Sequence, residues 1–234
     1  MKQRIMQKIL FSFAIIFLSI STNGQSKINQ ILKKELDSIL TEDQKFRELI
    51  SSELLQTKAD SIAASFKIPA NELTNYILKM IPLTDSLNLE RVEQIIKQYG
   101  YPGKSLVGKG TNEAAYFVIQ HSKKIDQYLP LIKKAVDKKE LAFTLYAMML
   151  DRSLLYNGKE QIYGTQAKGI HVLKKETGKK EFKYVIWPIQ NNSSVNQRRK
   201  KAGFTTAVEY YAKQNLGIEY KVLTLEDIKK MEVR

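Results

Sequence analysis

Two charged residues, Asp151 and Arg152, stand near the end of the most apolar stretch of the chain. Residues 140–156 predict a helix that is apolar on nearly every face from Leu141 to Leu150, which is typical of a buried central helix. A buried charge without a partner is very costly, so each of the two must find one. They could form a structural ion pair. Alternatively, Asp151 is a catalytic carboxylate and Arg152 binds an anionic substrate.

His121 is the candidate general base in the body of the chain. Ala114, Phe117, Val118 and His121 have the spacing i, i+3, i+4 and i+7, which puts the imidazole on the apolar face of a helix. If this face borders a pocket, the imidazole can exchange a proton near neutral pH. Otherwise His121 is a hydrogen-bonded core residue. The other histidine, His171, lies in a predicted hairpin and is expected to be structural or solvated.

A dense set of neutral polar side chains follows the buried helix, in the segment Gln161-Ile-Tyr-Gly-Thr-Gln166. Gly164 permits a tight bend or a close approach of a ligand to the backbone. The polar side chains can orient a polar substrate or can satisfy backbone groups where helix gives way to strand. The candidate catalytic residues are then His121, Asp151 and Tyr163. The candidate substrate-binding residues are Arg152, Gln161, Gly164, Thr165, Gln166, Arg198 and Arg199.

Positive charge is concentrated in the C-terminal third. Residues 167–201 contain ten basic and two acidic residues, a local charge of +8, and residues 197–201 form the strongest basic run. Such a run is either a solvated helix face or a source of arginines, Arg198 and Arg199, that bind an anion. The charge favours polyanions. We expect no nucleic-acid partner, because no recognised nucleic-acid-binding motif is present.

The composition excludes several kinds of site. The chain has 234 residues, no cysteine and only two histidines. A thiolate nucleophile, a disulfide, a zinc–thiolate site and a site with three histidines are therefore excluded. The common nucleotide-binding, serine-hydrolase and metalloprotease motifs are also missing. We expect neither a cofactor nor a metal ion.

A series of short motifs resembles the bacterial family catalogued as domain of unknown function 6624, over roughly residues 27–211. The motifs are Asp43-Gln44-x-x-Arg47, Asp85-x-x-Asn88, Gly100-Tyr-Pro102, Gln120-His121, Leu150-Asp151-Arg152, Gln161-x-Tyr-Gly-Thr-Gln166 and Val195-Asn196-x-Arg198-Arg199-x-x-Gly203. The resemblance implies signature positions at His121, Asp151, Arg152, Gln161, Tyr163, Gly164, Thr165, Gln166, Arg198 and Arg199. It implies no activity, because the family has none assigned.

Periodicity and capping signals predict the elements that carry these residues. The fold class is mainly α: a compact multi-helix domain with a small β-hairpin in the C-terminal third. Helices are predicted at 27–41, from Thr41 to about Phe66, from Pro69 to Pro82, and at 86–99, 111–122, 124–138, 140–156, 193–201 and 205–215. A loop is predicted at 101–110, hairpin strands at 168–174 and 181–187, and a strand at 219–223 before a helical end.

The N-terminus has the layout of a secretory signal peptide. Three basic residues precede about a dozen mostly apolar residues, and small polar residues follow. Removal of residues 1–24 would lower the net charge from +14 to +11. We expect an exported protein, periplasmic or secreted, with no membrane span after cleavage. The remainder divides into an N-terminal helical segment, 25–82, and a core helical domain, 83–234, or forms one domain, 25–234.

Three functions are compatible with these features. The first is an enzyme, a hydrolase or transferase, that acts on a polar or anionic substrate in a pocket built from His121, Asp151, Arg152 and the loop from Tyr163 to Gln166. The second is a non-catalytic binding module for an anionic ligand of the cell envelope. In the third, the polar residues form a buried structural network that fixes the helices. The ligand and the oligomeric state are left open.

Overall fold

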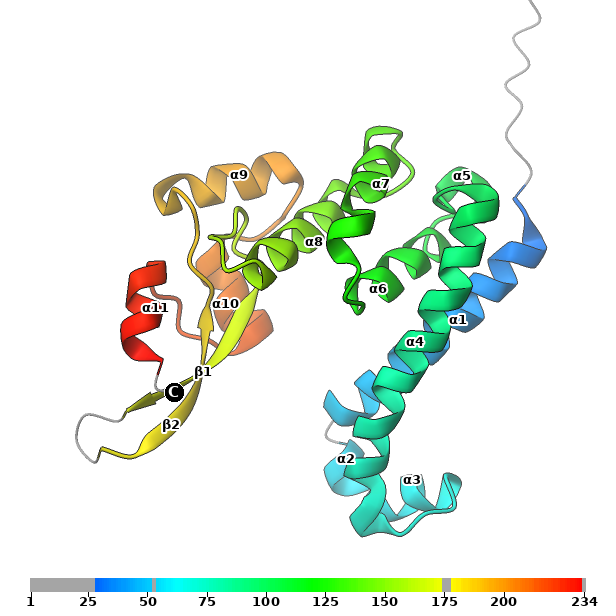
Figure 1. Cartoon of the computed structure of the whole chain (residues 1–234), viewed down its shortest axis with the longest axis horizontal. Coiled ribbons are helices and arrows are strands. Elements are labelled where there is room, and N and C mark those ends of the chain that lie inside the picture. Colours follow the sequence, from blue (N-terminus) through cyan, green and yellow to red (C-terminus); the bar gives the residue numbers. More distant parts are fainter. Residues whose placement is uncertain (1–27, 52–53, 174–177, 233–234) are drawn as a thin grey trace, which may run out of the picture.

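The computed structural model describes residues 28–51, 54–173 and 178–232 (Figure 1). The chain is mainly helical, with one antiparallel β-hairpin in the C-terminal third, which confirms the predicted fold class. The predicted signal peptide, residues 1–24, lies outside the described residues.

The helices and strands follow one another along the chain in a mostly local order. They are α1 (Gln30–Ser51), α2 (Leu54–Thr57), α3 (Ala59–Ser65), η1 (Ala70–Glu72), α4 (Leu73–Tyr99), α5 (Lys104–Val107), η2 (Thr111–Glu113), α6 (Ala114–Gln120), α7 (Ile125–Asp137), α8 (Phe143–Tyr156), β1 (Ala167–Leu173), β2 (Lys180–Ile186), η3 (Asn192–Ser194), α9 (Val195–Ala202), α10 (Val208–Leu216) and α11 (Leu225–Met231).

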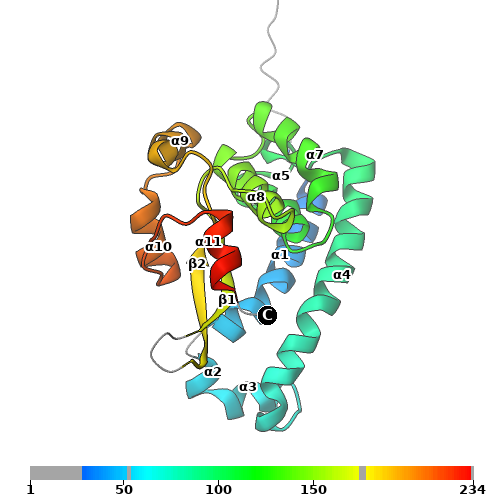
Figure 2. The ribbon, with the colours of Figure 1, turned by 60° about the vertical axis from the view of Figure 1, so that its left-hand side comes forward.

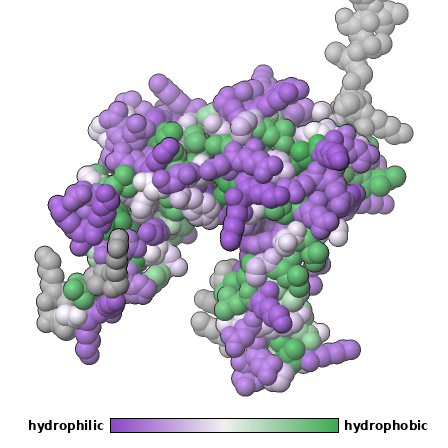
Figure 3. Space-filling view, in the orientation of Figure 1, coloured by the Kyte–Doolittle hydropathy of each residue, from purple (hydrophilic) through white to green (hydrophobic). Residues whose placement is uncertain are grey.

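These elements form an arch with two legs. One leg contains the paired helices α1 and α4, with α2 and α3 at its lower end, and the other contains the β1–β2 hairpin and α11 (Figures 1 and 2). Helices α6, α7 and α8 join the legs across the top. An open notch separates the two legs in the space-filling view (Figure 3). Helices α6, α7 and α8 thus connect the two legs (Figure 1).

The main core lies where α1, α4, α6 and α7 pack together. On α1, Leu32, Leu36 and Ile39 are buried at the spacing i, i+4 and i+7, so one stripe of this helix faces its neighbours. Val92 and Ile95 of α4 complete the contact from the other side. This packing holds the functional side chains of α1 and α4 in register.

The predicted helix boundary at Thr41 is wrong, because α1 continues without a break to Ser51. The Thr41 hydroxyl donates to the carbonyl oxygen of Asp37 at 2.9 Å instead of capping a new helix. This bond to the residue four positions earlier is the alternative that a threonine has inside a helix. As a result, Asp43 lies in the middle of a long helix.

The predicted helix end at Pro82 is also wrong, because α4 runs through Pro82 to Tyr99. Proline removes one backbone donor and crowds the preceding turn. The helix continues because both of its halves bury side chains, such as Ile77 and Val92, against neighbouring elements. It ends at Gly100, as predicted, where a φ of 71° suits glycine. Helix α4 also crosses the predicted boundary between residues 82 and 83.

The C-terminal third follows the prediction more closely. Strands β1 and β2 pair antiparallel from Ala167 opposite Ile186 to Leu173 opposite Lys180, which confirms the hairpin. Residues 219–223 do not form the predicted strand, since the sheet has only two strands within the described part of the chain. The predicted loop at 101–110 contains the short helix α5. None of the helices in the described ranges is long and apolar enough to cross a membrane.

Candidate functional site

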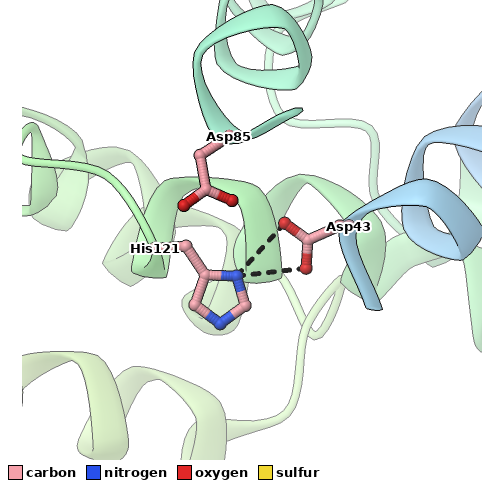
Figure 4. Close-up of side chains that lie close together, drawn as sticks. All are labelled: Asp43, Asp85 and His121. Atoms are coloured by element: carbon pink, nitrogen blue, oxygen red, sulfur yellow. Dashed lines mark hydrogen bonds and ion pairs between the residues drawn. The ribbon is translucent and has the colours of Figure 1, made fainter. Parts of the chain in front are cut away.

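A carboxylate–imidazole pair joins α1 to the end of α6. Nδ1 of His121 lies 3.1 Å from Oδ1 and 3.0 Å from Oδ2 of Asp43 (Figure 4). The Asp43 side chain is fully buried, whereas 14% of the His121 side chain is exposed. A buried carboxylate at this distance fixes the orientation of the ring and the nitrogen that carries the proton. Nε2 of His121 points away from both carboxylates in Figure 4.

Asp85 brings a second carboxylate to the same place. Its carboxylate group points toward His121 and Asp43 (Figure 4), and one ligand atom from each of the three residues lies within 4.8 Å of the other two. Oδ2 of Asp85 accepts a hydrogen bond from Nη2 of Arg47 at 2.8 Å. Oδ1 of Asp85 is buried and has no hydrogen-bond partner among the described residues. We refer to Asp43, Asp85 and His121 as the Asp–Asp–His cluster.

Three helices position this cluster. Asp43 lies one turn after the core residue Ile39 on α1, and Asp85 lies on α4, the helix that packs beside α1. Asn88, one turn after Asp85, contacts the carbonyl oxygen of Ile39 through its amide at 3.5 Å. His121 is the C-cap residue of α6, and its N–H donates to an earlier carbonyl of that helix at 3.1 Å. The cluster therefore depends on how α1, α4 and α6 pack.

Asp151 lies elsewhere and is fully buried. Its carboxylate accepts hydrogen bonds from the backbone N–H groups of Ile162, Tyr163 and Thr165 at 2.7 to 3.1 Å, and from the Thr165 hydroxyl at 2.9 Å. Burial raises the pKa of Asp151, and these hydrogen bonds act in the opposite direction. With both oxygens occupied by donors of the chain itself, the carboxylate holds the loop after α8 in place.

Gln161 and Gln166 close the same loop. The Gln161 side-chain amide donates to the carbonyl oxygens of Gln166 and Trp187 at 3.0 and 2.7 Å, and its oxygen accepts from the Gln166 N–H at 2.9 Å. Gly164 has a φ of 68°, and a Cβ there would lie 2.7 Å from side-chain atoms of Ile189 and Val208. Only glycine fits this bend without strain.

Two arginines of α9, Arg198 and Arg199, bind carbonyl oxygens of the loop that follows α8. Arg199, 1% exposed, donates to the carbonyl oxygens of Thr206 and Tyr163 at 2.9 and 2.8 Å. Its guanidinium stacks over Phe204, and burial lowers its pKa. Arg198 donates to the carbonyl oxygen of Ile162 at 3.0 Å and to three further acceptors in residues 190–194. Both guanidinium groups are thus occupied by acceptors of the chain itself.

Arg152 has a different environment, because it borders a pocket of about 420 Å³. Nε of Arg152 donates to Oε1 of Gln166 and Nη1 donates to the carbonyl oxygen of Gln120, both at 3.2 Å. The pocket is further lined by Thr165, Tyr184, Tyr211 and Asn215, together with apolar residues. A guanidinium beside neutral donors and aromatic rings suits a polar or anionic ligand.

Tyr163 is held by its backbone more than by its hydroxyl. Its N–H donates to Asp151 and its carbonyl oxygen accepts from Arg199, so one residue links the two buried charges. Its ring packs against Phe143 and Phe204, at 6.2 Å between ring centroids in both cases. Burial raises the pKa of the Tyr163 hydroxyl.

The sequence-predicted residues therefore fall into two groups. His121 belongs to the Asp–Asp–His cluster. A second group, here called the Asp151 network, ties α8 and α9 to the loop between α8 and β1. Its members are Asp151, Gln161, Tyr163, Thr165, Gln166, Arg198 and Arg199. The groups are joined through the chain, because Arg152 bonds both to Gln166 and to the carbonyl of Gln120, the residue before His121.

Asp43, Arg47 and Asp85 were not among the predicted site residues. Each was quoted within a motif, Asp43-Gln44-x-x-Arg47 or Asp85-x-x-Asn88, so the signal was present in the sequence. No local pattern predicts that these motifs meet His121, which lies 78 residues after Asp43. His171 is exposed and contacts the ring of Phe182.

The structure is that of a mainly helical protein with a small β-hairpin. Its candidate site is the Asp–Asp–His cluster, whose side chains come from three helices. The chain belongs to the family of unknown function DUF6624, which matches residues 32–222. The family resemblance expected from the sequence is thereby confirmed. No match was found among curated proteins, and none among solved structures.

Proposed function

We propose that this protein is an enzyme, a hydrolase or transferase that acts on a polar or anionic substrate, with His121 as its acid–base group. The observation that carries the proposal is the contact between the partly exposed imidazole of His121 and the fully buried carboxylate of Asp43. A base held by a second residue is the arrangement that general acid–base catalysis requires.

The chemistry follows from the two ring nitrogens. When the N–H at Nδ1 of His121 donates a hydrogen bond to Asp43, Nε2 keeps a free lone pair. Nε2 can then take a proton from a water molecule or a substrate hydroxyl, whose oxygen attacks the electrophilic atom of the substrate. The imidazolium that forms is stabilised by Asp43 and returns the proton to the leaving group. Arg152, beside its pocket, is suited to bind an anionic group of the substrate.

Asp151 has a supporting role in this proposal. Its acceptor positions are taken by the backbone and by Thr165, so it is poorly placed to remove a proton from a substrate. Instead it fixes the loop whose last residues, Thr165 and Gln166, line the Arg152 pocket. In this proposal the Asp151 network is structural, and the Asp–Asp–His cluster is the separate reacting centre.

Replacement of His121 tests the enzyme proposal. Chain 25–234 is assayed against p-nitrophenyl esters of acetate and phosphate, compared with His121→Asn, Asp43→Asn and the exposed control His171→Asn. We expect His121→Asn to lower kcat about 10²- to 10⁴-fold, the usual contribution of a positioned acid–base group. Asp43→Asn should also lower kcat, because the imidazole loses the carboxylate that orients it, and His171→Asn should match the parent.

Two outcomes would redirect this assignment. A folded His121→Asn variant with full activity would remove His121 from the chemistry. Saturable binding of a phosphate or carboxylate ligand without turnover would favour the second candidate, a binding module centred on the Arg152 pocket. In that case Arg152→Gln should abolish binding, and affinity should fall with added salt because the contact is charge-assisted.

We propose further that the protein is exported to the periplasm or secreted. The support is the basic, then apolar, then small and polar order of residues 1–24. Expression of the full sequence in a bacterial host should yield a chain whose intact mass lacks about the first 24 residues, in the periplasmic fraction or the medium. A full-length cytoplasmic product would contradict export.

A further inference from the structure

We propose that Asp43, Asp85 and His121 bind a divalent metal ion. Three side chains that are far apart in the sequence each present one ligand atom, and these atoms all lie within 4.8 Å of one another. The carboxylate groups and the imidazole face a common centre in Figure 4. Two carboxylate oxygens and one imidazole nitrogen form a ligand set that first-row divalent metals accept.

A second observation points to a missing cation. Oδ1 of Asp85 is the one buried side-chain nitrogen or oxygen atom without a hydrogen-bond partner in the part of the chain that the structure describes. The Arg47 guanidinium engages the other oxygen, Oδ2, at 2.8 Å. A buried anionic oxygen with no partner is costly, and a bound cation would satisfy it.

The surroundings of Asp43 resemble the outer shell of a metal site. The Gln44 side-chain amide donates to Oδ2 of Asp43 at 2.6 Å, and Nη1 of Arg47 donates to the Asp43 carbonyl oxygen at 2.9 Å. Partners that bond to a ligand side chain orient it, and their loss typically lowers metal affinity about 10- to 100-fold. They also fix Asp43 on α1, so the site does not have to be assembled when the ion binds.

The donor set narrows the choice of ion. Carboxylates suit magnesium, calcium and manganese, whereas an imidazole suits zinc, iron, nickel and copper. A mixed set with two carboxylates and one imidazole is therefore best matched by Mn²⁺ or Zn²⁺. Three protein ligands leave at least one coordination position for water or substrate, as in catalytic rather than structural sites.

Metal binding stands on this geometry alone, but the role of the ion rests on the proposed function. With the ion bound, Nδ1 of His121 is a ligand, so the single proton of the neutral imidazole lies on Nε2. Nε2 could then not accept the proton of the attacking water, and the ion would activate that water by lowering its pKa. His121 and Asp43 stay essential under both descriptions, although a chelator would abolish activity only if the ion is required.

Calorimetric titration tests the site directly. Chain 25–234 is stripped with EDTA and titrated with MnCl₂ and with ZnCl₂. The variants are Asp85→Asn, His121→Asn and two controls, Asp137→Asn on the surface of α7 and His171→Asn on the hairpin. We expect one ion per chain, an affinity at least about tenfold lower in Asp85→Asn and His121→Asn, and unchanged binding in both controls.

Paramagnetic broadening provides a second readout that needs no variant. Mn²⁺ added to the ¹⁵N-labelled chain should first remove the amide signals around Asp43, Asp85 and His121. Broadening centred elsewhere, no saturable binding of either ion, or equal binding by Asp85→Asn would each overturn the site. The cluster would then be a hydrogen-bonded network in which Arg47 holds Asp85 and His121 holds Asp43.

The results also separate this site from the enzyme proposal. Saturable binding of one ion without turnover of any ester upholds the metal site and rejects the enzyme. Turnover that survives EDTA, with no ion bound, upholds His121 as the base and rejects a catalytic role for the ion, while the titration alone decides whether the site binds one.

Discussion

Asp151→Ala should lower the free energy of unfolding by about 3–5 kcal/mol, because several buried donors would lose their acceptor at about 1–3 kcal/mol each. The substitution removes the acceptor of three backbone N–H groups, those of Ile162, Tyr163 and Thr165, and of the Thr165 hydroxyl. Thr165 is itself buried, so its donors cannot turn to water without opening the loop. Asp151→Asn should also destabilise the fold, because an NH₂ donor would then face N–H donors.

Urea denaturation followed by circular dichroism measures this effect. Asp137→Asn is the matched control, since Asp137 lies on the exposed side of α7 and pairs with Lys133 at 2.6 and 2.8 Å. The control should change the midpoint little, because exposed ion pairs contribute little. An Asp151→Ala midpoint equal to that of the control would show that the loop does not depend on this carboxylate.

Arg199→Met should be similarly destabilising, by about 3–5 kcal/mol, because each hydrogen bond to a charged group contributes about 1.5–3 kcal/mol and the buried acceptors lose their donors. The guanidinium is buried, donates to the carbonyl oxygens of Tyr163 and Thr206, and stacks over the rings of Phe204 and Tyr211. Lysine cannot reproduce a planar group that bonds in two directions while it stacks, so Arg199→Lys should recover little of the loss.

Neighbours on the same helix provide the control. Lys200→Met and Lys201→Met change the same kind of charge at exposed positions of α9, and their unfolding midpoints should stay close to that of the parent. If Arg199→Met were as stable as Lys200→Met, the buried arginine would have no structural role. An anion-binding role would then regain support.

The two large effects should not add. The Tyr163 peptide lies between the buried charges, with its N–H on Asp151 and its carbonyl oxygen on Arg199. Once either charged side chain is removed, the loop loses part of its fixed conformation. The hydrogen bond of the remaining side chain to Tyr163 then contributes less to stability. A double-mutant cycle of Asp151→Ala and Arg199→Met should show a coupling energy of about 0.5–3 kcal/mol, the range for residues in one network.

The network also influences the pocket next to it. Gln166 is held through Gln161 and in turn accepts from Nε of Arg152 at 3.2 Å. Loss of Asp151 should therefore weaken ligand binding at Arg152 indirectly, in proportion to the loss of stability. Such a result would identify Asp151 as a positioning residue rather than a catalytic one.

Local patterns predicted most of the secondary structure because they act within a turn or a hairpin. The apolar spacing of α8, the glycine that ends α4 and the β-forming residues of the hairpin all gave elements close to those observed. Thr41 and Pro82 were misread for one reason. Both carry signals of a helix end, but the apolar stripes of α1 and α4 continue past them, and the packing of those stripes is worth more than one cap or one missing donor.

By itself, the sequence determined that Asp151 and Arg152 would need partners if buried, and that His121 would lie on an apolar helix face. It determined neither which partners they find nor which side chains meet His121. Those outcomes depend on how α1, α4 and α6 pack and on how the loop after α8 folds back. The spacing of apolar residues along one helix does not specify which other elements that helix contacts. Only the tertiary structure therefore placed Asp43 and Asp85 beside His121, and occupied Asp151, Arg198 and Arg199 with the backbone.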